Sequence, residues 1–213
     1  MLHILTSDAI VARPDFLTVA ESLLHTLGPA GAFHLRTRTL TGHHYTSIAR
    51  YLTTVSRDTG TLLVINGRID IAIAAGVSAV QLGRGALSIA DVRRIAPPLR
   101  IGVSVHSLAE AQSAVAFHPD WLIAGHIYPT ATHPGAGGLG LAVLTSIVST
   151  TPIPVVAVGG VTPDHVSEIR SAGAGGIATI SGIWGDSDPN AAVIRYLWEY
   201  GDGGSRGEHD PQH

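Results

Sequence analysis

The sequence predicts an α/β protein folded as a single-domain (β/α)8 TIM barrel, and three observations favour this fold class. Eight short, nearly continuous apolar runs recur along the 213 residues, as expected of parallel strands buried on both faces. Segments with helical spacing separate these runs, and such alternation indicates a parallel sheet. No shift in composition within residues 1–200 marks a second domain, and α/β barrels commonly reach this size undivided.

The eight strands are expected at the eight apolar runs. An open doubly wound sheet is the rival architecture, but eight repeats without an insertion or a domain break favour a closed barrel. In chain order, the predicted strands are residues 2–6, 32–36, 62–66, 79–83, 100–104, 121–125, 154–160 and 176–181.

Helices are expected between the strands. Residues 15–27 and 107–117 place their apolar side chains on one stripe at helical spacing. The next clear helix follows the seventh strand, where Thr162 suits the N-cap, Pro163 the first turn and Gly173 the C′ position.

Composition limits the classes of function. Hydrophobic residues make up 45% of the chain and charged residues only 14%, and the net charge of −3 provides no basic field for nucleic acid. The absence of cysteine excludes disulfides and thiolate nucleophiles. No apolar run reaches the ~18 residues of a membrane helix, and the N-terminus lacks a basic leader, so a cytoplasmic location without membrane contact is expected.

The C-terminal residues 201–213 are Gly-rich, polar and without periodicity, which predicts a disordered tail after a barrel domain of residues 1–200. A homodimer is the expected oligomer, because two-fold dimers are the commonest assemblies.

Function in such barrels collects where the strands end. Side chains alternate along a strand, so His34 and Arg36 are expected to share a face. The polar and glycine residues expected at the strand ends are His34, Arg36, Arg38, Asn66, Gln81, Ser104, His106, His126, Gly159, Gly160, Ser181 and Gly182.

The last two strand ends predict a phosphate site. Barrels often bind phosphate with the loops after strands 7 and 8, through backbone amides that glycine leaves accessible. The alternative is that the paired glycines only permit a tight turn. The residues assigned to phosphate binding are Gly159, Gly160, Ile180, Ser181 and Gly182.

His126 directly follows the sixth strand, on the rim that faces the predicted phosphate. Imidazole titrates near neutrality and can accept and donate a proton there, although a lone histidine is more often a hydrogen-bonded bystander. No carboxylate or second histidine is placed to complete a metal site. In the following loop, Thr130 and His133 are candidate ligand contacts, and His133 is equally compatible with a solvated loop position.

Six stretches, in chain order, resemble the thiamine phosphate synthase/TenI superfamily. They are FHLRTR, VINGRIDIAIAAGVSAVQLGRG, IGVSVHSLAEA, GHIYPTATHPGAGGLG, IPVVAVGGV and GIATISGI. The resemblance covers about residues 1–185 and implies a (β/α)8 barrel that binds a small-molecule thiazole phosphate.

Departures from the superfamily's synthase motifs direct the choice between its two activities. The synthase joins a pyrimidine pyrophosphate to the thiazole with magnesium, which the aspartates of an Asn-Asp and a His-Leu-Gly-Gln-x-Asp motif hold. Here Gly67 and Ala86 stand at the two aspartate positions, and neither residue can ligate magnesium. The two lysines of the synthase loop are absent from residues 130–133 as well.

The pair Gly125-His126 resembles TenI-type thiazole tautomerases, in which the histidine at this position is the catalytic acid/base. The resemblance therefore implies a cofactor-independent isomerase in thiamine biosynthesis. His126 would transfer the proton that converts the carboxythiazole phosphate tautomer into its aromatic form.

The remaining polar residues receive binding roles in this interpretation. Arg36 and Arg38 would face the substrate carboxylate, since a guanidinium pairs with a carboxylate bidentately; a solvent-facing Arg38 is the alternative. Asn66 and Ser104 would orient the substrate, and Gln81 would pack in the core with its amide satisfied. Three other functions stay open: a thiamine phosphate synthase, a non-catalytic phosphate-binding regulator and another phosphate-binding barrel isomerase.

Overall fold

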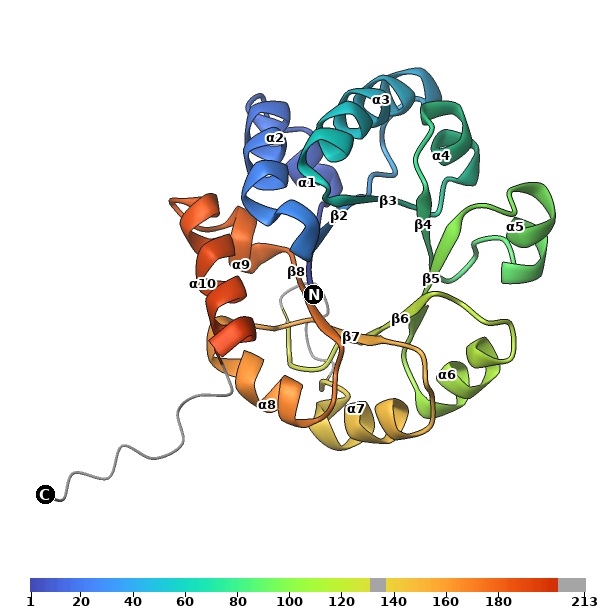
Figure 1. Ribbon diagram of the computed structural model, residues 1–213, viewed down its shortest axis with the longest axis vertical. Coiled ribbons are helices and arrows are strands. Elements are labelled where there is room, and N and C mark those ends of the chain that lie inside the picture. Colours follow the sequence, from blue (N-terminus) through green and yellow to red (C-terminus); the bar gives the residue numbers. More distant parts are fainter. Residues whose placement is uncertain (131–136, 203–213) are drawn as a thin grey trace, which may run out of the picture.

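Eight parallel strands close into a barrel in the computed structural model (Figure 1), which describes residues 1–130 and 137–202. Each strand pairs with the next along the chain, and β8 pairs with β1 to close the ring. The predicted fold is confirmed, and each predicted strand lies within two residues of an observed one. The strands are β1 (Leu2–Leu5), β2 (Gly31–Leu35), β3 (Leu62–Asn66), β4 (Ala79–Leu82), β5 (Arg100–Val105), β6 (Trp121–Gly125), β7 (Val155–Val158) and β8 (Gly176–Thr179).

Helices surround the barrel and cover the outward faces of the strands. The α-helices are α1 (Asp8–Val11), α2 (Phe16–Leu27), α3 (Gly42–Thr59), α4 (Ile69–Ala75), α5 (Ile89–Ile95), α6 (Leu108–Val115), α7 (Gly140–Ser149), α8 (Val166–Ser171), α9 (Ser181–Trp184) and α10 (Pro189–Asp202). The structure also has two short 3-10 helices, η1 (Gly28–Ala30) and η2 (Pro163–His165).

The predicted helix after β7 begins as η2 and continues as α8. Thr162 lies at the N-cap and its N–H donates to Nδ1 of His165 (3.3 Å). Gly173 follows the C-cap with a φ of +85°, the left-handed conformation that glycine adopts without strain. The predicted N-cap, first-turn and C′ positions of this helix are therefore confirmed, and its first turn is a 3-10 turn rather than an α-helical one.

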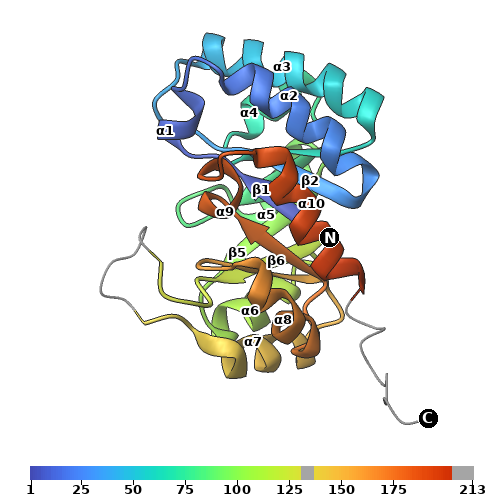
Figure 2. The ribbon, with the colours of Figure 1, turned by 90° about the vertical axis from the view of Figure 1, so that its left-hand side faces the viewer.

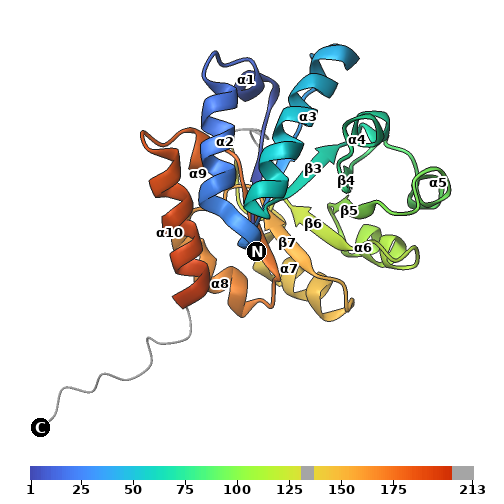
Figure 3. The ribbon, with the colours of Figure 1, turned by 45° about the horizontal axis from the view of Figure 1, so that its top comes forward.

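The last helix, α10, packs beside α2 and α8 (Figure 3), and Tyr196 donates a hydrogen bond to the carbonyl of Val161 (2.9 Å). This helix continues to Asp202, and residues 203–213 of the predicted tail lie outside the described residues. The disordered tail and the homodimer stay predictions. None of the helices in the described ranges has the length and apolarity that crossing a membrane requires.

Inside the barrel, inward-pointing residues of every strand except β5 form a small apolar cluster that is separate from the helix-covered core. Its members are Leu5, Ala32, Val64, Ala79, Trp121, Ile123, Val156 and Ala178. Toward the strand ends, several inward positions are polar, and Asn66, Gln81 and Ser104 line the cavities that open there. The ends of the strands therefore carry the chemistry, because the apolar layer closes the barrel beneath them.

Trp121 fits this interior only because β5 carries a glycine beside it. A Cβ atom on Gly102 would lie 2.2 Å from both Oε1 of Gln81 and Nε1 of Trp121. These two side chains share a 2.8 Å hydrogen bond in the interior.

We expect Gly102→Ala to lower the free energy of unfolding by about 1–3 kcal/mol, because the added methyl group overpacks a full interior. Chemical denaturation measures this change. Gly42→Ala is the matched control, since its Cβ would meet no atom closer than 3.7 Å. Equal stability of the two variants would show that the interior yields easily around Trp121.

Candidate active site

Two adjoining cavities open where the strands end. Figure 2 shows α1 and α9, which follow β1 and β8, at the end of the barrel away from the N-terminus. The first cavity, here the β6–β8 cavity, has a volume of about 320 Å³. The second, the β2–β4 cavity, has about 360 Å³. Four residues line both cavities: Arg36, Asn66, Gln81 and Ser104.

A buried chain of hydrogen bonds supports Asn66. Nδ1 of His3 lies 2.8 Å from Nε2 of His34, and Nδ1 of His34 lies 3.1 Å from Oδ1 of Asn66. Burial lowers the pKa of His34 to about 4, against a smaller opposing effect of the Asn66 hydrogen bond, and burial also lowers the pKa of His3. Both rings are therefore neutral at pH 7.

Neutrality gives this chain a direction. The amide oxygen of Asn66 only accepts, so Nδ1 of His34 carries the proton and Nε2 holds a lone pair. His3 must then donate to His34 from its own Nδ1. With its oxygen occupied, Asn66 has the N–H groups of its amide left for the cavities that it lines.

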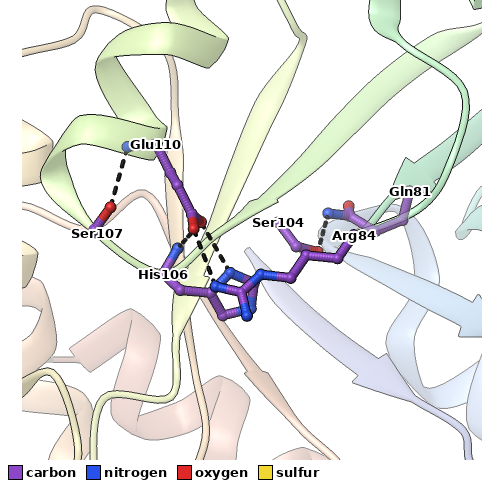
Figure 4. A network of polar contacts seen from close by, with 6 residues as sticks. All are labelled: Gln81, Arg84, Ser104, His106, Ser107 and Glu110. Carbon is purple, nitrogen blue, oxygen red and sulfur yellow. Dashed lines mark hydrogen bonds and ion pairs between the residues drawn. The ribbon is translucent and has the colours of Figure 1, made fainter.

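A second chain supports Ser104 in the same manner. Trp121 donates from Nε1 to Oε1 of Gln81 (2.8 Å), and Gln81 donates from Nε2 to Oγ of Ser104 (3.0 Å; Figure 4). The Ser104 oxygen thus accepts from the Gln81 amide, so the hydroxyl proton of Ser104 is available to a ligand in the cavities. Gln81 is 2% exposed with its amide satisfied, as predicted. Together the two chains present hydrogen-bond donors to an acceptor-rich ligand.

Glu110 on α6 connects two cationic or titratable side chains at the rim (Figure 4). Its carboxylate accepts from Arg84 (3.0 Å) and from the backbone N–H of His106 (2.7 Å), and lies 3.0 Å from Nδ1 of His106. Burial alone would raise the pKa of Glu110, but the hydrogen bonds from His106 and Arg84 hold it below its usual range. Glu110 is therefore a carboxylate at neutral pH and orients Arg84.

Four arginines line the β2–β4 cavity: Arg36, Arg38, Arg68 and Arg84. Arg68 forms a bidentate pair with Asp70, through Nε (2.8 Å) and a terminal amino group (2.6 Å). This hydrogen bonding lowers the pKa of Asp70 and raises that of Arg68. The guanidinium groups of Arg36 and Arg38 make no hydrogen bond or ion pair with another residue that the structure describes.

The structure brings most of the predicted site residues together. Arg36, Asn66 and Ser104 line both cavities, and Arg38 lines only the β2–β4 cavity. Gly182 is not among the lining residues, and His133 lies outside the described residues. The predicted residues that line only the β6–β8 cavity are His126, Thr130, Gly159, Gly160, Ile180 and Ser181.

The paired glycines after β7 are required by close packing as well as by backbone conformation. Gly159 and Gly160 have φ values of +94° and +68°. A Cβ on Gly159 would lie 2.2 Å from Cβ of His126, and one on Gly160 would lie 2.6 Å from the carbonyl oxygen of Pro129. The tight-turn explanation thus holds for both glycines, and it leaves their backbone on the cavity wall.

The sequence interpretation assigned no binding role to Arg68, Arg84 or Glu110. A usable signal was present, because each arginine stands two residues after the end of a predicted or observed strand, at β3 and β4. Glu110 gave no such signal, since its role depends on α6 folding back over the end of β5.

At the two positions where the similar synthase motifs carry aspartates, the residues of this chain do not fit a divalent cation. Gly67 and Ala86 offer no ligand side chain, and both line a cavity that carries four arginines. Across residues 1–130 and 137–202, no three His, Asp or Glu side chains are grouped to hold a metal ion. Mg²⁺ prefers carboxylate oxygens and waters as ligands, and a cationic wall disfavours it.

Comparisons with known proteins agree on one family. The model of the thiamine monophosphate synthase family matches residues 2–183. The thiamine-phosphate synthase of Methanoregula boonei is 38% identical over 194 residues, 90% of this chain and 89% of that protein. That of Pyrococcus furiosus is 35% identical over 192 residues, 90% of each chain. The solved thiamine phosphate pyrophosphorylase from Pyrococcus furiosus has a TM-score of 0.85 and 31% identity, covering 95% of this chain and 96% of that one.

These comparisons overturn the predicted thiazole tautomerase. The relatives that match 90% of the chain are named synthases, so an isomerase is not supported, and the alternative of a thiamine phosphate synthase agrees better. The prediction gave too much weight to Gly125-His126. One histidine at a strand end fits several reactions, because a shared barrel hosts different chemistries. The assignment to thiamine biosynthesis agrees with the relatives' names.

The buried histidine chain should make stability depend on pH. Between pH 6.5 and pH 4 the unfolded chain protonates His34 while the folded protein does not. The free energy of unfolding should therefore fall by about 3 kcal/mol as the pH drops through this window, from this residue alone. Denaturant titrations at pH 7, 6, 5 and 4 measure the fall.

His34→Gln removes the titrating ring, so the variant should lose that much less stability over the same window. His25→Gln, at an exposed position of α2, is the control and should follow the wild type. Parallel curves for the wild type and His34→Gln would contradict a neutral buried His34.

Proposed function

The chain belongs to the thiamine monophosphate synthase/TenI family, and on this premise we propose that it is a transferase of the thiamine-phosphate synthase type. It would join a pyrimidine diphosphate to a thiazole phosphate and release pyrophosphate. The observation that carries this proposal is the pair of adjoining cavities with four residues in common. Two phosphorylated substrates that must react with each other need two anion sites side by side.

The thiazole phosphate belongs in the β6–β8 cavity in this proposal. Val158, Gly159, Gly160 and Ser181 line it, and Ser181 opens α9, so its backbone N–H has no carbonyl partner one turn earlier. Backbone N–H groups at such a position favour a phosphate. His126 and Thr130 lie on the same wall and would contact the phosphate or the ring.

The transfer forms one C–N bond as the C–O bond to the diphosphate breaks, and the bonding electron pair leaves with the pyrophosphate. Negative charge therefore builds on the leaving group, where fixed guanidinium groups stabilise it. Arg36 stands on the wall common to both cavities, close to the join between the two substrates. Neither bond change moves a proton, so the reaction needs no acid or base at His126.

We expect purified protein to form thiamine phosphate from the pyrimidine diphosphate and the thiazole phosphate, with one pyrophosphate released per product. Ser181→Asp should raise the KM for the thiazole phosphate at least tenfold, because the added carboxylate repels the phosphate. Chromatographic detection of product and a coupled pyrophosphate assay measure both quantities.

Ser146→Asp, at an exposed position on α7, adds the same charge away from the cavities and should keep the wild-type KM. Thiazole phosphate binding without any product formation would reject the transferase and leave a phosphate-binding, non-catalytic member of the family.

A further inference from the structure

We infer that the β2–β4 cavity is a metal-independent site for a diphosphate group, in which arginines occupy the place of a divalent cation. This inference rests on the proposed function for its natural ligand, the diphosphate of the second substrate. The binding site itself is argued from the charges, the open space and the arginine contacts of this cavity.

Charge favours a polyanion in this cavity. Its thirteen described lining residues include four arginines and no carboxylate. Three carboxylates that are not lining residues contact the segments that carry these arginines. Asp70 holds Arg68, Glu110 holds Arg84, and Asp8 accepts the backbone N–H of Arg38 (2.6 Å). The lining of this cavity is thus cationic, and these carboxylates are not part of it.

The ion pairs orient the arginines without using all their donors. A guanidinium has five N–H groups. Asp70 accepts from two nitrogens of Arg68, and Glu110 accepts from one nitrogen of Arg84, so each arginine has N–H groups left. Because the bidentate pair with Asp70 already holds the guanidinium of Arg68, less side-chain entropy is lost when phosphate oxygens bind it.

The backbone of this cavity leaves room for the ligand. A Cβ atom on Gly67, Gly83 or Gly85 would meet no atom within 4 Å. The open space lies beside the two positions where the family's synthase motifs carry aspartates, Gly67 and Ala86. Aspartates there need a metal between themselves and a diphosphate, since like charges repel. Without them, guanidinium groups can bind the phosphate oxygens directly.

Calorimetric titration with inorganic pyrophosphate tests this site apart from any turnover. The wild-type protein should bind pyrophosphate in EDTA. Replacing EDTA by millimolar magnesium should lower the Kd for pyrophosphate by no more than about threefold, a change smaller than the 1.4 kcal/mol of a tenfold difference. Inorganic phosphate should bind at least tenfold more weakly, because it spans fewer arginines.

Arg68→Met and Arg84→Met should each weaken pyrophosphate binding in EDTA at least tenfold. Arg94→Met is the matched control for Arg84→Met. The two side chains are 77% and 75% exposed, and each contacts one carboxylate, but Arg94 lies on α5 outside the cavity. Arg94→Met should bind pyrophosphate like the wild type.

Binding that appears only after magnesium is added would overturn the inference, as would equal affinities of Arg84→Met and Arg94→Met. Failure of the proposed function looks different. Arginine-dependent binding in EDTA without thiamine phosphate formation would keep this site and reject the transferase. Product formation that strictly requires magnesium would keep the transferase and reject this site.

Discussion

The closed parallel barrel sends every second residue of each strand into one shared interior, and the site depends on how that interior is filled. An apolar layer that includes Trp121 and Ile123 closes the lower part. Beside it, the buried polar side chains of β1 to β6 form hydrogen bonds with one another. The two hydrogen-bond chains that end at Asn66 and Ser104 are the result.

The direction of these hydrogen-bond chains connects the buried interior to the groups that face the cavities. One begins at Nδ1–H of His3 and the other at Nε1–H of Trp121, and each ends at a side chain whose remaining N–H or O–H groups can donate into the cavities. The groups at the cavity floor therefore donate. A phosphate or diphosphate only accepts at its bare oxygens, so the neutral interior and the cationic rim both suit the phosphorylated ligands that we propose. This arrangement requires neutral histidines, which their burial provides.

The fold and several residues that line the two cavities were predictable from the sequence, because both follow from local patterns. Apolar runs mark the strands, and the residues just after them are brought to one mouth by the barrel. Arg36, Asn66 and Ser104 were found in this way. Glu110 and the histidine chain were not, since they depend on which side chains meet across neighbouring elements. His34 could be placed on the face of Arg36, but only the register of β1 against β2 puts His3 against it.

The tautomerase prediction failed for a different reason. It rested on single positions, the histidine after β6 and the absence of aspartates at positions 67 and 86, which the motifs of two activities distinguish. The overall similarity to synthases weighs more, and the arginines of the β2–β4 cavity offer a physical substitute for the missing metal ligands. Loss of a carboxylate motif is therefore compatible with retention of the ligand, provided that cations of the chain itself take over.

A crystal structure of the protein grown in EDTA with thiazole phosphate and pyrophosphate tests this account most directly. The account predicts the monophosphate against Gly160 and Ser181 in the β6–β8 cavity, and the pyrophosphate against Arg36, Arg68 and Arg84 with no cation between them. Pyrophosphate absent from the β2–β4 cavity in EDTA, and present there only with a bridging magnesium after soaking, would contradict it.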